Sequence, residues 1–152
     1  MPTIKIEQAS ITDLQILYKI ERECFFSEAF SMEEILFLIK NPNSISLVAK
    51  ISGQIAGFVI GLVYDAGKEK IGHVFTLDVA KKYRRKGVAM KLMKELELKF
   101  KEKGAKECFL EVRIDNNAAR KLYEKLGYEE IACLKDYYGS GVHGIKLKKV
   151  LN

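Results

Sequence analysis

The chain has 152 residues, 48% of them hydrophobic and 30% charged, which is the balance of a soluble globular protein with enough residues for one substantial core. The N-terminal stretch lacks the apolar segment of a signal peptide, and no apolar run approaches the length of a membrane span, so we expect a cytoplasmic protein that does not bind membranes. The net charge of +6 does not by itself identify a partner.

Residues 3–8 alternate between apolar and polar side chains, which predicts a first strand. A Ser-x-x-Asp capping box then predicts a helix over 10–24, and a Ser-x-x-Glu box predicts a second, short helix over 31–39. The Asn-Pro-Asn sequence at 41–43 is a stop and turn signal. The first quarter of the chain therefore indicates a strand followed by two helices.

Three strand-like runs follow, at 45–51, 54–64 and 71–80. The connections between them, Ser52-Gly53 and Asp65–Lys70, are short enough for antiparallel hairpins. We therefore expect these three runs to be neighbours in one sheet.

The second half alternates helices and strands. A helix begins after Gly87 and ends near Lys103, a strand covers 107–113, and Asp115 or Asn116 caps a helix that ends after Leu126. Two further strands, IACLK and GIKLKKVL, complete the chain. The order β-α-α-β-β-β-α-β-α-β-β predicts one α/β domain over 1–152, with about seven strands in a mixed, mostly antiparallel sheet, four helices and a right-handed parallel crossover at 71–113.

Three cations, Arg84, Arg85 and Lys86, run directly into Gly87 at the start of a helix. Cations are unfavourable at the positive end of a helix dipole, but they are reasonable there if an anion is the natural occupant. Gly87 would let the backbone approach that anion closely, and Ala89 would keep the first turn narrow. This pattern favours a phosphate site.

The alternative is a solvated helix face. The stretch 81–106 holds eleven Lys and Arg residues and three acids, and each acid stands four residues before a lysine, in the favourable order. These pairs explain part of the run, but not the three cations before the glycine. Because no hydroxyl follows for Mg²⁺, a nucleotide triphosphatase is not expected.

The segment Arg84–Ala89 matches the R/Q-x-x-G-x-G/A signature of the GNAT acetyltransferases, between a strand and a helix as in that family. The segment LEVRIDNNAARKLYEKLGY (110–128), followed by DYYGSGVHGIKL, resembles the RimI-type ribosomal-protein alanine N-acetyltransferases of bacteria. It also resembles the protein N-terminal acetyltransferases of archaea and eukaryotes. The order of elements is similar to the GNAT fold over essentially the whole chain.

The resemblance implies acetyl-CoA as cosubstrate. The backbone amides of 85–90 would hold its pyrophosphate, and the strand 77–79 would pair with its pantetheine arm by backbone hydrogen bonds. Asn116 would contact the cosubstrate, cap its own helix, or do both. Asp78 departs from the small apolar residue that the family often has there, so only its backbone role is implied. The implied cosubstrate contacts are Leu77, Asp78, Val79, Arg84, Arg85, Lys86, Gly87, Val88, Ala89, Met90, Asn116 and Tyr123.

Acetyl transfer from a thioester to an amine needs a base for the amine and an acid for the departing thiolate. Glu111 lies in the apolar run CFLEV, and a carboxylate among apolar side chains is expected to bind a proton more tightly, which suits a base near neutral pH. A salt bridge to Arg113, on the same strand face, is the alternative. The family glutamate falls on Glu111, which favours the catalytic reading.

Tyr123 lies on the next helix, where helical spacing alone would explain an aromatic residue packed beside leucines. The family tyrosine at this position sits near the sulfur and is taken as the acid, so the resemblance makes Tyr123 the candidate acid. His73 and His143 are the other titratable candidates, and we expect both to be structural. With two histidines and no CxxC motif, no metal site is expected.

The acceptor should lie across the mouth of the site. The resemblance implies that Tyr137 and Tyr138 shape a peptide groove, and that the segment 24–31, with Phe26 and Phe30, forms its other wall. A hairpin with exposed aromatic residues is the alternative for the tyrosine pair. Phe30 occupies a place where the family frequently has tryptophan.

Three cysteines, Cys24, Cys108 and Cys133, are far apart and odd in number. We expect them to be buried, reduced side chains and not a disulfide framework.

The leading hypothesis is an enzyme that acetylates protein N-terminal α-amines, with ribosomal proteins as one class of acceptor, acting as a monomer or homodimer. The first alternative is a lysine or small-molecule amine acetyltransferase, which would not need a peptide groove. The second is a non-catalytic module that binds CoA or RNA. Nucleic-acid binding is disfavoured because aromatic residues are not interleaved with the lysine run.

Overall fold

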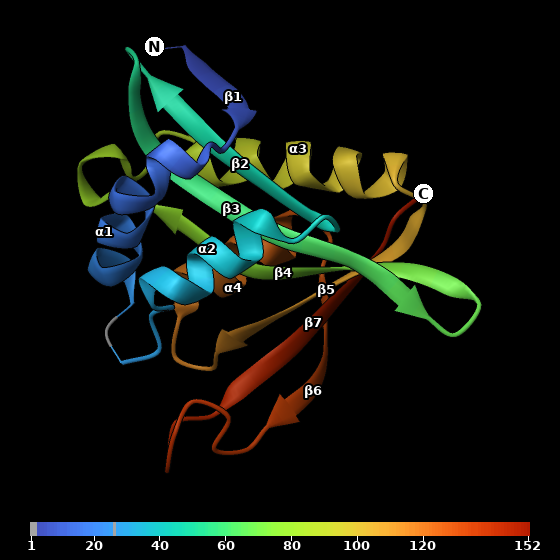
Figure 1. Ribbon diagram of the computed structural model, residues 1–152. Helices are drawn as coiled ribbons and strands as arrows, with labels where there is room; N and C mark the ends of the chain where they lie inside the picture. The colour runs from blue at the N-terminus through green and yellow to red at the C-terminus, as the bar shows by residue number, and fades with distance from the viewer. Residues whose placement is uncertain (1–2, 26) are drawn as a thin grey trace.

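The computed structural model describes residues 3–25 and 27–152. Its seven-stranded sheet has the order β1-β2-β3-β4-β5-β7-β6, and helices cover both faces (Figure 1). The strands are β1 (Ile4–Gln8), β2 (Ser44–Ile51), β3 (Gln54–Ala66), β4 (Glu69–Val79), β5 (Ala105–Arg113), β6 (Glu129–Leu134) and β7 (Gly144–Val150). The helices are α1 (Leu14–Cys24), α2 (Met32–Lys40), α3 (Val88–Glu102) and α4 (Asn117–Lys125), with short 3₁₀ turns η1 (Ile11–Asp13) and η2 (Lys81–Tyr83). The predicted fold class and element order are confirmed.

The capping boxes predicted from the sequence are present at the starts of η1 and α2. The first box opens a 3₁₀ turn, so the α-helix proper begins at Leu14, later than expected. The β3–β4 hairpin is also tighter than expected, because Asp65 pairs with Lys70 within the ladder and the turn shrinks to Gly67-Lys68. The sequence signals therefore located the elements, but their exact ends depend on a 3₁₀ turn before α1 and on strand pairing in the β3–β4 hairpin.

The two faces of the sheet bury separate apolar clusters. Val48 and Phe58 face α1 and α2, whereas their neighbours Leu47 and Val59 face the cluster that includes α3 and α4. This is the alternation that the period of two in a strand produces when both faces are covered.

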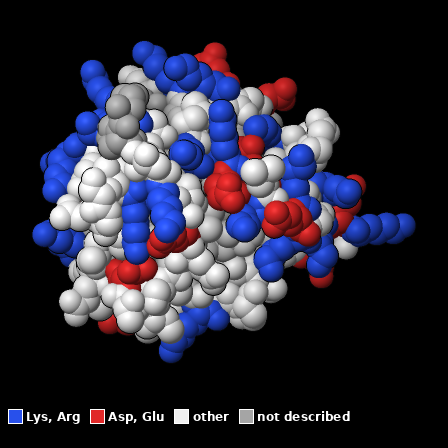
Figure 2. Space-filling view, turned by 90° about the horizontal axis from the view of Figure 1, so that it is seen from above, with Lys and Arg blue, Asp and Glu red and all other residues white. Residues whose placement is uncertain are grey.

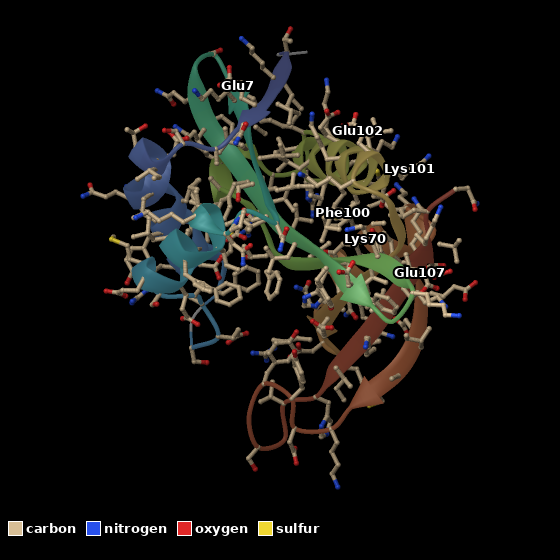
Figure 3. The ribbon with its side chains drawn as sticks, turned by 45° about the vertical axis from the view of Figure 1, so that its right-hand side comes forward. Glu7, Lys70, Phe100, Lys101, Glu102 and Glu107 are labelled. Atoms are coloured by element: carbon tan, nitrogen blue, oxygen red, sulfur yellow. The ribbon has the colours of Figure 1, made fainter. Side chains whose placement is uncertain are left out.

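Phe100 of α3 packs directly on the sheet (Figure 3). A Cβ atom at Gly61 or Gly72, in β3 and β4, would collide with the Phe100 ring. The two strand glycines therefore make room for one large aromatic residue, which brings α3 close to the strands beside it.

β4 and β5 are parallel, as predicted, but only a short part of each is paired. Residues Lys70–His73 of β4 pair with residues Ala105–Phe109 of β5. Beyond these residues the remaining parts of the two strands, 74–79 and 110–113, do not pair with each other. The sheet is therefore split between β4 and β5 at the end where β4 leads into η2 and α3. Every candidate site residue on a strand lies at or beyond this split.

The cysteine prediction is right for Cys108, which is buried, while Cys24 is only half-buried. It is wrong for Cys133, which is exposed because β6 is an edge strand with most of its residues open to solvent. None of the helices in the described part of the chain is long and apolar enough to span a membrane.

Candidate active site

A groove of about 1570 Å³ opens at the split between β4 and β5. Its walls come from both split strands, the loop before α3, the start of α4, the α1–α2 segment and the β6–β7 loop. The candidate residues that line it are Phe30, Leu77, Val79, Arg84, Arg85, Gly87, Val88, Ala89, Met90, Glu111, Asn116, Tyr123, Tyr137 and Tyr138. Asp78 and Lys86 do not line it, and Phe26 lies outside the described residues.

One end of the groove is the N-terminus of α3. Arg85 and Gly87 both have positive φ angles, 63° and 82°, so the loop curls into a concave turn of backbone amides. Gly87 is the helix N-cap, no side chain caps the first turn, and no acid lies in it. A Cβ atom at Gly87 would meet no atom within 4 Å, which leaves the space above these amides open. This is the geometry of an anion site, and it fits the pyrophosphate of a CoA molecule.

The cations of this loop differ in what they contact. The Arg84 Nε atom donates to the Val79 carbonyl at 3.1 Å, so this side chain ties the loop to the end of β4. Arg85 lines the groove, whereas Lys86 is exposed outside it. Figure 2 shows Lys and Arg side chains spread over one face of the molecule with acidic side chains among them, so part of the positive charge is solvated surface.

Asn116 caps α4, as one of the two interpretations predicted. Its Oδ1 atom accepts a hydrogen bond from the Ala119 amide at 3.1 Å, and the residue also lines the groove. The side chain is therefore held in place by its own helix at the groove wall.

Glu111 lies next to His73 across the split strands. The Glu111 Oε1 and His73 Nε2 atoms are 2.7 Å apart, and both side chains are mostly buried, with 16% and 18% of their surface exposed. The alternative salt bridge to Arg113 is not formed, because Arg113 pairs with Glu28 and Asp115, each at 3.0 Å. Glu111 therefore forms no ion pair with a lysine or arginine among the described residues, and its partner is an imidazole that can exchange protons.

Tyr123 is buried on α4, with 6% of its surface exposed, and its ring packs edge-on against Tyr128 at 5.6 Å. Burial raises the pKa of Tyr123, and the neighbouring Cys108 raises it further. The phenol therefore stays protonated at neutral pH and is available as a hydrogen-bond donor. Tyr123 lines the groove, and among the described residues no hydrogen-bond partner of its hydroxyl is found.

The opposite end of the groove is formed by segments distant in sequence. Tyr137 and Tyr138, in the β6–β7 loop, pack edge-to-face with ring centroids 4.9 Å apart. Burial raises the pKa of both hydroxyls, and the negative charge of Glu111 raises it further, so the pair lies within electrostatic reach of that carboxylate. The Glu28–Arg113 ion pair joins the α1–α2 segment to β5.

Comparison with known proteins identifies the family. Residues 14–128 match the acetyltransferase (GNAT) family. The chain belongs to the GNAT acetyltransferases. An N-alpha-acetyltransferase of Sulfurisphaera tokodaii is 30% identical over 146 residues, covering 90% of this chain and 87% of that protein.

Two solved structures share the fold of this GNAT acetyltransferase. Ard1 of Thermoplasma volcanium matches with a TM-score of 0.87 and 24% identity over 98% of both chains. The ribosomal-protein-S18-alanine N-acetyltransferase of Escherichia coli matches with a TM-score of 0.83 and 23% identity over 99% of this chain and 95% of that one. The chain is therefore an acetyl-CoA-dependent N-acetyltransferase, which sets the non-catalytic alternative aside.

Sequence reasoning about this acetyltransferase assigned both histidines a structural role. His143 does hold the β6–β7 loop, since its Nδ1 atom accepts a hydrogen bond from the Asp136 amide at 2.9 Å. His73, by contrast, lies in the groove beside Glu111. The signal that could have found it is the parallel β4–β5 register, which sets His73 opposite Phe109, two residues before Glu111. That register is a long-range property and is not visible along either strand alone.

Proposed function

We propose that this enzyme transfers the acetyl group of acetyl-CoA to the N-terminal α-amine of protein chains. The observation that carries the proposal is the Glu111–His73 pair, which lines the same groove as the buried Tyr123 and the tyrosine pair. The N-alpha-acetyltransferase relative supports the α-amine as acceptor. Ribosomal proteins are one acceptor class that we propose.

In this mechanism the bound acetyl-CoA supplies a thioester carbonyl that an amine can attack. The concave amides at Arg85 and Gly87 would hold the pyrophosphate, and residues 77–79, which pair with β3 but not with β5, would offer their free backbone edge to the pantetheine arm. The split between β4 and β5 fits an extended chain, because the two strands do not pair there. These contacts would bring the thioester toward Tyr123, which lines the same groove.

Glu111 then accepts a proton from the acceptor amine, directly or through one water. His73 orients the carboxylate through the 2.7 Å contact and gives the proton a second place to go. Tyr123 donates its phenol proton to the departing thiolate. Burial keeps that proton on the phenol until the sulfur develops negative charge.

The α-amine is the preferred acceptor on pKa grounds. A chain N-terminus has a pKa of about 7.7–8.0 and a lysine side chain one of about 10.4, so near pH 7 roughly a tenth of α-amines but less than about a thousandth of lysines are neutral. One carboxylate beside one histidine can remove the proton from the first far more easily than from the second.

The test is a peptide panel with acetyl-CoA, varying the first two residues, together with an N-terminally blocked peptide that contains lysine. Mass spectrometry locates the acetyl group. We expect acetylation of free N-termini only. Faster acetylation of the blocked lysine peptide would instead support the lysine acetyltransferase alternative.

A further inference from the structure

Two buried carboxyl groups lie on either side of a single hydroxyl at the wall of the groove. Glu21 of α1 and Asp78 of β4 are each only 1% exposed. The Thr76 Oγ1 atom is 2.7 Å from Glu21 Oε1 and 2.5 Å from Asp78 Oδ1. A hydroxyl has one proton to donate, so it can serve only one of these two acids. Two unpaired carboxylates so close together in an apolar interior would repel each other strongly.

One additional proton resolves the conflict. If Asp78 is protonated, its O–H donates to Thr76 Oγ1, and the Thr76 hydroxyl donates to Glu21. Glu21 is the natural anionic end of this chain, because its other oxygen already accepts the Phe30 amide at 3.0 Å. The second Asp78 oxygen is buried without any hydrogen-bond partner among the described residues, as suits the carbonyl oxygen of a neutral acid better than a carboxylate.

The charged and titratable neighbours agree with this assignment. Burial raises the pKa of Asp78, the negative charge of Glu21 raises it further, and Arg84 opposes the shift only in part. From the other elements, Cys24 of α1 and Tyr123 of α4 face the same carboxyl, and the pKa of each is raised, mainly by burial. Neither of these two groups brings a positive charge that would stabilise an ionised Asp78.

The chain connects the two sides of the site. Asp78 lies in the β4 segment proposed to hold the pantetheine arm, and Phe30 lies in the α1–α2 segment that walls the acceptor side. We propose that the hydrogen-bond chain Asp78–Thr76–Glu21, completed by one buried proton, positions the acceptor wall through the Phe30 amide. These are positioning residues for acceptor binding, and the inference rests on the proposed function for what that wall receives.

The decisive measurement needs no substrate. ¹³C NMR of side-chain carboxyl groups in the whole protein should show one aspartate still protonated at pH 7, and this signal should be absent in Asp78→Asn. If every aspartate carboxyl is ionised at pH 7, the inference is wrong. In Glu21→Gln the amide can donate to Thr76, which leaves the Thr76 hydroxyl to donate to Asp78, and no anion faces Asp78, so its titration midpoint should fall by about one pH unit or more. An unchanged midpoint would contradict the chain.

The second measurement links the proton to the acceptor wall. The Phe30 amide resonance should shift as Asp78 ionises at alkaline pH, and the peptide KM should rise with it by about tenfold while the acetyl-CoA KM changes little. In Asp78→Asn both changes should disappear, because the amide donates to Thr76 at every pH. A Phe30 resonance that follows pH equally in both proteins would contradict the proposal. If no peptide is acetylated, the proposed function fails, but the NMR result still decides the inference.

Discussion

The proposed phosphate-binding end of the groove is built from residues that are neighbours in the chain, whereas the proposed acceptor end is assembled from segments far apart. The anion cradle consists of consecutive backbone amides around Arg85 and Gly87, shaped by two positive φ angles. The acceptor side depends on side chains that meet across the fold, such as Glu28 with Arg113 and His73 with Glu111. Local backbone geometry therefore shapes the proposed phosphate site, and tertiary contacts shape the proposed acceptor end.

The largest effect on kcat is expected at Glu111, the residue proposed to take the proton from the amine. Glu111→Gln preserves shape and hydrogen bonding to His73 but cannot take a proton, so kcat near pH 7 should fall by about 10²-fold or more. The deficit should shrink above about pH 9, where the α-amine is already neutral. The measurement is a pH–rate profile on one peptide with a free N-terminus.

A matched control lies on the same strand. Glu107→Gln removes a carboxylate that pairs with Lys148 at 2.7 Å, and it should leave the profile unchanged because Glu107 is not part of the groove. A Glu111→Gln deficit that is constant from pH 7 to pH 10 would mean that Glu111 positions the substrate and that His73 is the base.

Tyr123→Phe should lower kcat by about 10²-fold with little change in the KM of either substrate, because it removes only the hydroxyl. Because burial raises the pKa of Tyr123, wild-type activity should not decline through loss of its proton as the pH rises to 9. The variant and the wild type are compared by steady-state kinetics. A kcat within about twofold of wild type would leave Tyr123 with a packing role only.

The contrast between the two sides also explains what the sequence could predict. The cradle was predictable because a glycine after three cations at the start of a helix is a local pattern. The capping boxes, the element order and the Asn116 cap were predictable for the same reason. The position of His73 beside Glu111 was not predicted, since their contact spans 38 residues and depends on the parallel register of β4 and β5.

The Arg113 alternative failed for a related reason. Residues two apart on a strand share a face, which made a Glu111–Arg113 bridge reasonable. In the structure, Arg113 turns instead to Glu28, 85 positions away, and to Asp115. Sequence spacing gives the face of a strand, but not which of several acids a cation reaches.

Two glycine substitutions distinguish a blocked phosphate site from the general effect of backbone strain. Gly87→Val places a branched side chain at a φ of 82° and fills the open space above the amides, so CoA affinity should fall by about tenfold or more. Gly67→Val is the control, because Gly67 also has a positive φ, 71°, and open surroundings, but lies in the β3–β4 turn. Calorimetry should find weaker CoA binding only for Gly87→Val, and equal affinity in both folded variants would argue against the phosphate site.

The acceptor side should respond differently. Replacing Tyr137 and Tyr138 together by Ala removes the aromatic pair, so the peptide KM should rise by roughly threefold to tenfold, as expected for lost aromatic contacts. The acetyl-CoA KM should change little, because the cradle is formed by other segments. Kinetics with each substrate varied in turn would measure both constants. A loss confined to acetyl-CoA binding would place the tyrosine pair on the cofactor side.

The smallest effect on activity near pH 7 is expected at Asp78, whose substitution should appear in stability instead. The folded-state pKa of Asp78 is raised above its unfolded value, chiefly by burial, so the wild type is most stable relative to Asp78→Asn at low pH, where the carboxyl is protonated in both states. As the pH rises past about 4, the unfolded chain ionises while the folded protein keeps the proton, and wild-type stability is progressively lost. This loss continues until the pH reaches the folded-state pKa and is constant above it.

Asp78→Asn cannot ionise in either state, so it should not show this loss. Its melting temperature should exceed that of the wild type by more than about 4 °C at pH 8, because a carboxyl that keeps its proton up to pH 7 costs the wild type more than about 1 kcal/mol, and the difference should vanish below about pH 4. Thermal unfolding across this pH range, followed by circular dichroism, measures the difference. Lys149 with Glu97 provides a comparison among residues that do not line the groove, because Lys149→Met removes a partly buried ion pair and should lower the melting temperature at pH 8 instead of raising it. If the wild type is instead more stable than Asp78→Asn at pH 8, Asp78 is ionised in the folded protein. The two sides of the groove would then be joined by the charge pair of Asp78 with Arg84 and not by a shared proton.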